Sequence, residues 1–94
     1  MTRVRARRRG RRCSLEARGH AAGSREVCAA VSGILYALAG YLANAGCRVY
    51  QKRMESADVL LEFGQGRGGL AAWRMAVVGL KQLEQAYPEL VRLE

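Results

Sequence analysis

The stretch RCSLEARGHAAGSREVCAAVSGILYAL, residues 12–38, changes its hydrophobic period near its middle. Before Gly19, apolar and polar residues alternate, which is the pattern of a strand with one buried face. After Ser24, apolar residues recur at steps of three and four, which predicts an amphipathic helix that closes near residues 44–46. Ser24 is a suitable N-cap for this helix, and Glu26 places a negative charge in its first turn. The stretch therefore predicts a strand, a short loop and a helix.

The residues ahead of this stretch predict another strand. Val4 and Ala6 alternate with arginines over residues 2–8, and Gly10 marks a turn. Because two alternating strands are joined by a short turn, residues 2–18 predict a β-hairpin.

The second half of the chain repeats the order strand, strand, helix. Residues 47–54 and 59–63 predict two strands. Apolar residues at helical spacing over residues 70–87 predict a second helix, which ends before Pro88 because the residue preceding a proline is pushed out of helical dihedrals. Residues 89–94 alternate weakly and predict a short edge strand.

These elements give the order strand-strand-helix-strand-strand-helix, an α/β (α+β) fold with a mainly antiparallel sheet and two helices that cover one sheet face. With 94 residues, of which 50% are hydrophobic, the chain has enough apolar material for one core but not for two. Residues 1–94 therefore predict a single domain. Because chains of this size are often marginally stable and a shared buried face is a common remedy, we also expect a homodimer.

The formal net charge of +8 comes from one end of the chain. Seven of the sixteen basic residues are arginines within residues 3–12, and the other nine nearly balance the eight acidic residues. Clustered arginines favour phosphate groups whatever the sequence, so this segment is typical of a surface that contacts nucleic acid. A solvated hairpin is the competing interpretation, because a basic block alone is a weak motif.

The three cysteines, Cys13, Cys28 and Cys47, form no C-x-x-C pair and are odd in number. They predict neither a zinc site nor a disulfide framework, and no metal or other cofactor is expected. Free thiols are typical of a reducing compartment. The residues that follow the arginines are mixed and polar, unlike the apolar stretch of a signal peptide, so we expect a cytoplasmic protein.

A membrane helix is the alternative for residues 27–47, which contain no charged residue and are long enough to span a bilayer. Ser32, Tyr36, Tyr41 and Asn44 interrupt this segment, and much of the remainder is Ala and Gly, which contribute little transfer energy. A buried helix in a small dimer accounts for the same pattern, so no membrane partner is expected.

The segment Gly64–Gly69 matches G-x-G-x-x-G between a strand and a helix, as in dinucleotide-binding proteins. That fold needs a parallel strand-helix-strand unit with an acidic residue at the end of the second strand. Here the glycines are followed only by a helix and a short tail. We therefore interpret the glycines as a flexible connection.

His20 and Cys28 form a candidate catalytic pair. His20 is the only histidine, and it lies on a loop directly after a strand, eight residues before Cys28. A lone histidine is usually a surface or core residue, and a free cysteine is usually a small buried hydrophobe. The first turn of a helix changes this interpretation for Cys28, because free N–H groups and the helix dipole favour a thiolate and a nearby imidazole can take the proton. Cys13 and Cys47 are interpreted as core residues on strands.

Ser32 lies four residues after Cys28, on the same helix face. Its hydroxyl can hydrogen-bond the sulfur or a substrate. A hydrogen bond back to a helix carbonyl is at least as good an interpretation from the spacing alone.

Two short motifs surround the candidate pair. Gly19-His20-Ala21, followed by Val27-Cys28-Ala29-Ala30-Val31-Ser32, resembles the signature of the ribosomal-processing cysteine proteases of bacteria. Asp58-Val59-Leu60-Leu61, the second helix up to Tyr87-Pro88 and the tail follow the layout of the same family. The resemblance therefore covers nearly the whole chain.

The resemblance implies a homodimeric, cytoplasmic hydrolase that acts in ribosome biogenesis. Such a thiol protease is an endopeptidase that removes the N-terminal extension of a bacterial large-subunit ribosomal protein during ribosome assembly. By position, His20 is the base of a Cys-His dyad, Cys28 is the nucleophile, and Ser32 and Gly19 are supporting site residues. The implied partners are the extended ribosomal protein and, through the arginine-rich N-terminal strands, ribosomal RNA.

Two features differ from the family pattern. The loop between His20 and Cys28 is shorter, and Arg25 stands where the family usually has an Asp three residues before the Cys. By its position, Arg25 is included among the residues that bind substrate or support the site, although an arginine cannot do the job of a carboxylate that orients the base or contacts substrate. The alternative function is a non-catalytic basic module that binds ribosomal RNA or a ribosomal protein, which needs the arginines but no reactive Cys28.

Overall fold

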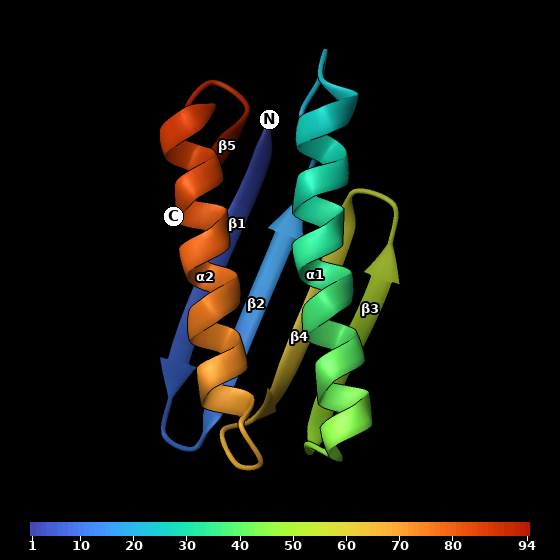
Figure 1. Ribbon diagram of the computed structural model, residues 1–94, viewed down its shortest axis with the longest axis vertical. Helices are drawn as coiled ribbons and strands as arrows, with labels where there is room; N and C mark the ends of the chain where they lie inside the picture. Colours follow the sequence, from blue (N-terminus) through green and yellow to red (C-terminus); the bar gives the residue numbers. More distant parts are fainter.

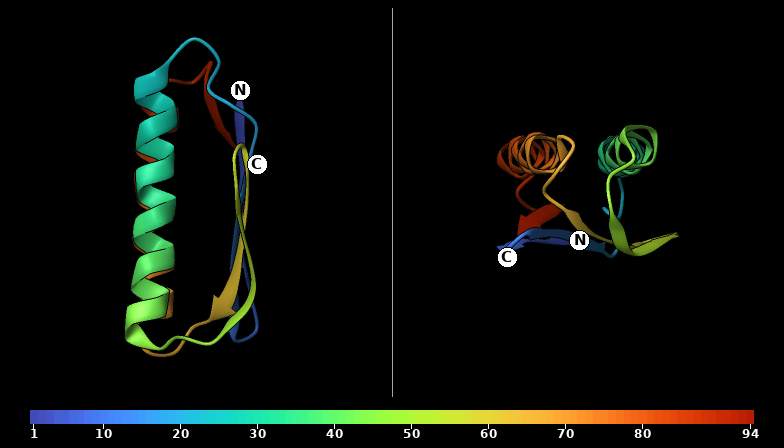
Figure 2. Two further views of the ribbon diagram at one scale, coloured as in Figure 1. Left: turned by 90° about the vertical axis from the view of Figure 1, so that its right-hand side faces the viewer. Right: turned by 90° about the horizontal axis from the view of Figure 1, so that it is seen from below.

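Two helices lie side by side on one face of a five-stranded sheet, and the opposite face of the sheet is uncovered (Figure 1, Figure 2). This computed structural model describes residues 1–94. The strands are β1 (Thr2–Arg9), β2 (Arg12–Arg18), β3 (Val49–Glu55), β4 (Asp58–Gly64) and β5 (Val91–Leu93). The helices are α1 (Arg25–Ala45) and α2 (Gly69–Ala86).

The strand order is β3-β4-β2-β1-β5. All neighbours are antiparallel except β5, which pairs in parallel with β1. The predicted fold class is confirmed, with both hairpins, both helices and the short edge strand in place. The parallel pairing of β5 makes the sheet mixed rather than purely antiparallel.

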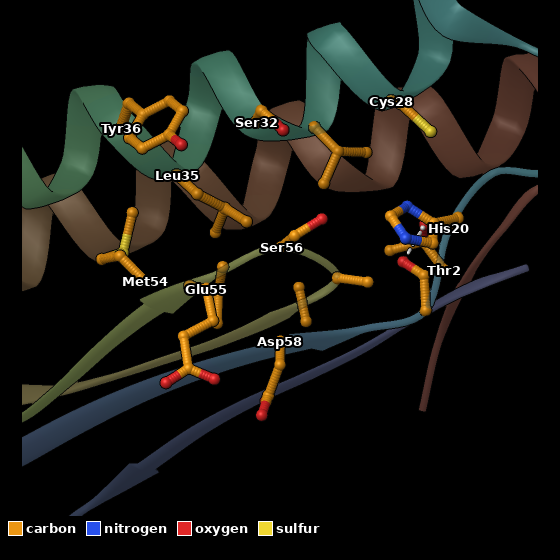
Figure 3. A pocket seen from close by; sticks show the side chains of 15 residues that line it. Thr2, His20, Cys28, Ser32, Leu35, Tyr36, Met54, Glu55, Ser56 and Asp58 are labelled. Atoms are coloured by element: carbon orange, nitrogen blue, oxygen red, sulfur yellow. Dashed lines mark hydrogen bonds between the residues drawn. The ribbon is translucent and has the colours of Figure 1, made fainter.

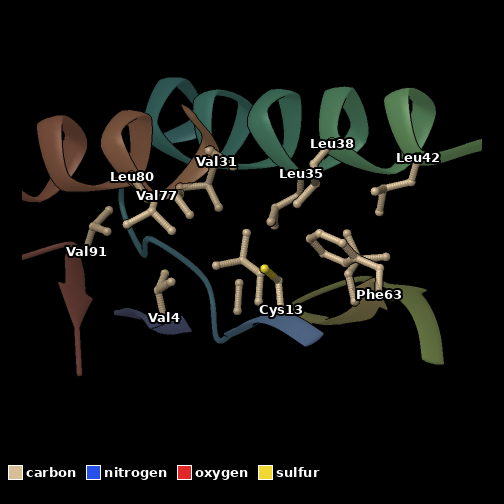
Figure 4. Close-up of a cluster of buried hydrophobic side chains, with 14 of the residues drawn as sticks. Val4, Cys13, Val31, Leu35, Leu38, Leu42, Phe63, Val77, Leu80 and Val91 are labelled. Carbon is tan, nitrogen blue, oxygen red and sulfur yellow. The ribbon is translucent and has the colours of Figure 1, made fainter. Parts of the chain in front are cut away.

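The core lies between the inner face of the sheet and the helices (Figure 4). On β2, Cys13 and Leu15 are fully buried, and they lie opposite Phe63 and Leu61 of β4 in the register. The alternation read from the sequence therefore separates buried from solvent-facing residues as expected. The buried helix residues share the predicted apolar spacing: Val27, Val31, Leu35, Leu38 and Leu42 from α1, and Ala76, Val77 and Leu80 from α2.

Capping residues fix both ends of α1. Ser24 has an extended backbone, and its hydroxyl accepts a hydrogen bond from the Val27 N–H at 3.2 Å. At the other end, Gly46 has a φ of 70°, a left-handed conformation, and its N–H donates to the Ala43 carbonyl at 3.4 Å. The Ser24 cap places Cys28 in the first turn, as the sequence predicts.

Cys47 differs from the sequence-based expectation, and two tyrosines near the C-terminal ends of the helices are exposed. Cys47 lies in the connection after α1 rather than on a strand, because its N–H donates to the Leu42 carbonyl and helps to close the helix end. It is half-buried instead of a core residue. Tyr41 is 42% exposed, since its hydroxyl donates to the Arg67 carbonyl at 2.9 Å at the rim of the helix layer. Tyr87 is 44% exposed because it follows the last turn of α2.

α1 is long and apolar enough to cross a membrane by length and composition. A core helix passes the same test. In the structure, the apolar face of α1 from Val27 to Leu42 is buried against the sheet.

Candidate active site

A cavity of about 350 Å³ lies between α1 and the tip of the β3–β4 hairpin (Figure 3). α1 contributes Cys28, Val31, Ser32, Leu35 and Tyr36 to its lining, the end of β2 and the following loop contribute Ala17, Gly19 and His20, and the hairpin contributes Met54 to Val59. Thr2 completes the lining. The cavity therefore joins residues from both halves of the chain.

The loop that carries His20 is anchored on two sides. Gly19 has a φ of +90°, and a Cβ at this position would collide with the Met1 carbonyl oxygen, so only glycine fits here. The Gly19 N–H donates to the Ala57 carbonyl at 2.9 Å. The Gly19 carbonyl accepts a hydrogen bond from the Thr2 hydroxyl at 3.1 Å, and Thr2 is only 3% exposed. These contacts fix the backbone immediately before His20.

The Cys28 thiol is half-buried in the first turn of α1. Its Sγ lies 3.6 Å from the Ala21 carbonyl oxygen, to which it donates. Figure 3 shows the sulfur pointing from α1 toward the side of the cavity where the His20 ring lies. The structure therefore brings both residues to one cavity, with the thiol resting on the Ala21 carbonyl rather than on the imidazole.

The start of α1 also determines which backbone donors are free. Ser24 uses two of them, since its hydroxyl accepts from the Val27 N–H and its carbonyl accepts from the Cys28 N–H at 3.2 Å. The N–H groups of Arg25 and Glu26 donate to no backbone carbonyl, as is usual in a first helical turn. These two donors are the ones available to a negatively charged oxygen near the thiol.

The other predicted site residues surround the pair. Ser32 lines the main cavity one turn beyond Cys28, and its hydroxyl faces the hairpin (Figure 3). Arg25 is exposed and lines a second, more open hollow of about 460 Å³, which His20 and Cys28 also border. Gly19 lies in the main cavity wall. All five residues are therefore gathered around two adjoining hollows.

Sequence reasoning missed the opposite wall of the cavity. The hairpin tip from Met54 to Val59 forms this wall, and although Asp58 and Val59 belong to the Asp58-Val59-Leu60-Leu61 motif, none of its residues was predicted to belong to the site. Thr2 and, on the α1 side, Tyr36 also line the cavity and carry no motif. Their role depends on the pairing of distant strands, which local spacing does not encode. No group of three or more His, Cys, Asp or Glu side chains is arranged to hold a metal ion.

Residues 1–92 match the model of one protein family, described as cysteine protease Prp. The chain belongs to this family. It is therefore a hydrolase of the cysteine protease class, which confirms the family and enzyme class expected from the Gly19-His20-Ala21 and Val27-to-Ser32 motifs.

Solved structures share the fold of this Prp-family chain. The ribosomal processing protease Prp from S. aureus, in complex with a covalently linked product peptide, superposes with a TM-score of 0.85 at 18% identity, over 100% of this chain and 98% of the other. The same S. aureus protease with a substrate peptide gives 0.75 at 17% identity, with the same coverage. SMU.848 from Streptococcus mutans gives 0.74 at 26% identity, over 100% and 92%. A sequence search of curated proteins finds no match.

Cys28 should be the most readily alkylated cysteine of the folded protein near neutral pH. It borders two hollows, whereas Cys13 is fully buried, and burial raises the pKa of the Cys13 thiol against the opposing effect of Arg8 and Arg74. Limited iodoacetamide treatment followed by mass mapping measures the three rates, with Cys28→Ala as the control. Faster labelling of Cys13 or Cys47 would contradict an activated Cys28.

Proposed function

We propose that the protein is a cysteine endopeptidase of the bacterial cytoplasm that removes the N-terminal extension of a large-subunit ribosomal protein during ribosome assembly. Cys28 is the nucleophile and His20 is the base of a Cys-His dyad. One observation carries this proposal: in a chain of a cysteine protease family, the thiol at a helix start and the only histidine border the same cavity.

The solved relatives support the choice of substrate. The S. aureus protein of the same fold is a ribosomal processing protease, and its structures contain a substrate peptide and a covalently linked product peptide. In this chain, the main cavity opens to solvent beside Cys28, so a peptide can reach the thiol.

The reaction begins when the Cys28 thiol turns from the Ala21 carbonyl and gives its proton to His20. The thiolate attacks the carbonyl carbon of the scissile peptide bond, and the new oxyanion accepts hydrogen bonds from the free Arg25 and Glu26 N–H groups. The bond to the leaving amine breaks as the protonated His20 donates its proton to the amine, which leaves an acyl-enzyme. His20 then deprotonates a water molecule, which hydrolyses the thioester and releases the acid.

The cavity beyond the dyad accommodates the substrate chain. Val31, Leu35 and Met54 provide apolar walls that suit an apolar side chain of the peptide. Ser32 offers a hydroxyl to the peptide backbone on one side, and Arg25 offers a cation in the adjoining hollow.

The partners in this proposal are the ribosomal protein, ribosomal RNA beside it and a second copy of the chain. The second copy would cover the outer side of the helix layer, where an apolar groove of about 540 Å³ runs between α1 and α2. Met75 at this groove is 73% exposed, and small residues such as Ala37, Ala71 and Gly79 allow a second helix to approach closely. At a rise of about 1.5 Å per residue, α1 is about 32 Å long and α2 about 27 Å long, so together they offer an extended surface to a second copy related by two-fold symmetry.

The dyad predicts a specific loss of cleavage. Cys28→Ala should abolish processing of an extended ribosomal protein while leaving the fold intact, because a small residue in a first helical turn costs little stability. His20→Ala should remove most activity, since His20 is the only histidine of the chain and its ring lies on the side of the cavity toward which the thiol points. The assay scores the appearance of a shortened N terminus by mass spectrometry.

A second outcome would support the non-catalytic alternative. If the wild-type protein binds the extended substrate but leaves it uncut, the endopeptidase proposal fails, and a basic module that binds ribosomal RNA or ribosomal protein becomes the better description. In that case Arg25, which stands where the family usually has an Asp, is the first residue to substitute.

Thr2 should act as a positioning residue for His20. Thr2→Val keeps the side-chain shape but removes the hydroxyl that holds the Gly19 carbonyl, so kcat should fall about tenfold with little change in KM. Thr2→Ser retains the hydroxyl and should restore most of kcat. Wild-type turnover in Thr2→Val, or equal losses in both variants, would show that this hydrogen bond does not position the histidine.

The helix groove predicts the oligomeric state. Wild-type protein should elute as a dimer in size-exclusion chromatography with light scattering, and Met75→Lys should yield monomers because it places a charge in the apolar groove. Gln85→Lys adds the same charge to an exposed position of α2 outside the groove, and it should leave the dimer intact. A monomeric wild type would overturn this interface.

A further inference from the structure

The face of the sheet that points away from the helices carries arginines from three adjacent strands. Figure 2 shows that no element covers this face. Alternation on β1 places Val4 in the core and its neighbours on the open side. The outer arginine face consists of Arg3, Arg5, Arg7 and Arg9 of β1, Arg12 and Arg18 of β2, and Arg92 of β5.

The register places like charges directly against each other on this face. Arg3 lies opposite Arg18 on one side and opposite Arg92 on the other, and Arg9 lies opposite Arg12. Like charges in directly opposed positions destabilise a sheet. The arrangement is therefore unfavourable for the isolated fold and favourable once an anion lies across it.

Carboxylates neutralise only part of the outer arginine face. Arg5 pairs with Glu94 at 3.4 Å, and Arg12 pairs with Glu62 at 3.3 Å. Arg18 pairs with Glu16 at 3.3 Å and with Asp58 at 3.7 Å. The other members of the face have no carboxylate within ion-pair distance: Arg3, Arg7, Arg9 and Arg92. The unpaired charge therefore lies along β1 and β5.

A shallow hollow and an aromatic ring lie beside these arginines. Arg7, Arg9 and Arg12 border the hollow of about 270 Å³, and Glu62, the partner of Arg12, also lines it. The Arg12 guanidinium lies 3.7 Å above the centre of the Tyr50 ring, which adds a flat aromatic side chain at the edge of the face. Same-face residues of one strand are about 6.6 to 6.8 Å apart, so the arginines of β1 form a regular row.

We propose that the outer arginine face binds RNA through its phosphate backbone. Guanidinium groups bind phosphate oxygens in pairs of hydrogen bonds, and a row of them contacts successive phosphates without reading the base sequence. This inference extends the proposed function, because a ribosomal protein substrate lies beside ribosomal RNA. The RNA site and the thiol cavity lie on opposite faces of the sheet, so RNA and peptide bind at the same time.

The test compares two variants with the same loss of charge. Arg3→Gln/Arg7→Gln/Arg9→Gln neutralises unpaired members of the outer face. In the matched control, Arg8→Gln/Arg74→Gln/Lys81→Gln removes three charges from the helix side: Arg8 alternates to the inner side of β1, and the other two are exposed on α2. The probe is a short RNA duplex, and its Kd is measured by fluorescence anisotropy at several salt concentrations.

The outer-face variant should bind RNA at least about tenfold more weakly, and its slope of log K against log salt should be shallower by about 2 to 3, at roughly 0.9 per lost phosphate contact. The control should keep a slope close to that of the wild type. The melting temperature of the outer-face variant should equal or exceed that of the wild type, because opposed like charges are removed. Lost binding then cannot be ascribed to unfolding.

Three results would overturn the proposal: no salt-dependent RNA binding by the wild type, equal losses in both variants, or tighter binding of polyglutamate or anionic vesicles than of RNA. Cleavage of a free extended peptide separates this proposal from the proposed function. The outer-face variant should cleave that peptide at the wild-type rate. A wild type that binds RNA on this face but cuts no peptide would leave the RNA site standing and remove only the endopeptidase.

Discussion

The burial of β2 in the middle of the sheet is the constraint on which the rest of the structure depends. β2 has β1 on one side and β4 on the other, and in the view of Figure 1 it runs between the two helices. Its inward residues Cys13, Leu15 and Ala17 are all buried. Because only a short loop separates its end from the Ser24 cap, the chain must enter α1 above the same end of the sheet, which brings the histidine and the thiol to one cavity.

Local patterns predicted the elements because each element is determined by neighbours in the sequence. Alternation predicted the strands, and Ser24, Gly46 and Pro88 predicted where the helices begin and end. The features that were missed depend on distant segments: the parallel pairing of β5, the approach of the hairpin tip to α1, and the hydrogen bond from Thr2 to Gly19. The sequence therefore identified the candidate dyad but not the wall that faces it.

The same alternation separates the charge of the protein from its cavity. On β1, Thr2 and Val4 are buried and Ala6 is half-buried, whereas the arginines that alternate with them belong to the open face. The sheet and its side chains thus lie between the unpaired guanidinium groups and the thiol. Mobile ions further limit the reach of the exposed charges, since the Debye length is about 8 Å at physiological ionic strength. A strongly basic protein can in this way keep its unpaired guanidinium groups apart from the cavity that Cys28 and His20 line.

The contacts of the Ala21 carbonyl bear on the first step of the proposed mechanism, in which the Cys28 thiol turns toward His20. This carbonyl accepts two hydrogen bonds, one from the Ser24 N–H at 3.1 Å and one from the Cys28 thiol at 3.6 Å. A thiol is a weak donor, and the Ser24 bond alone satisfies the buried carbonyl. Turning the thiol toward His20 therefore leaves no buried polar group unpaired, so the step costs little free energy.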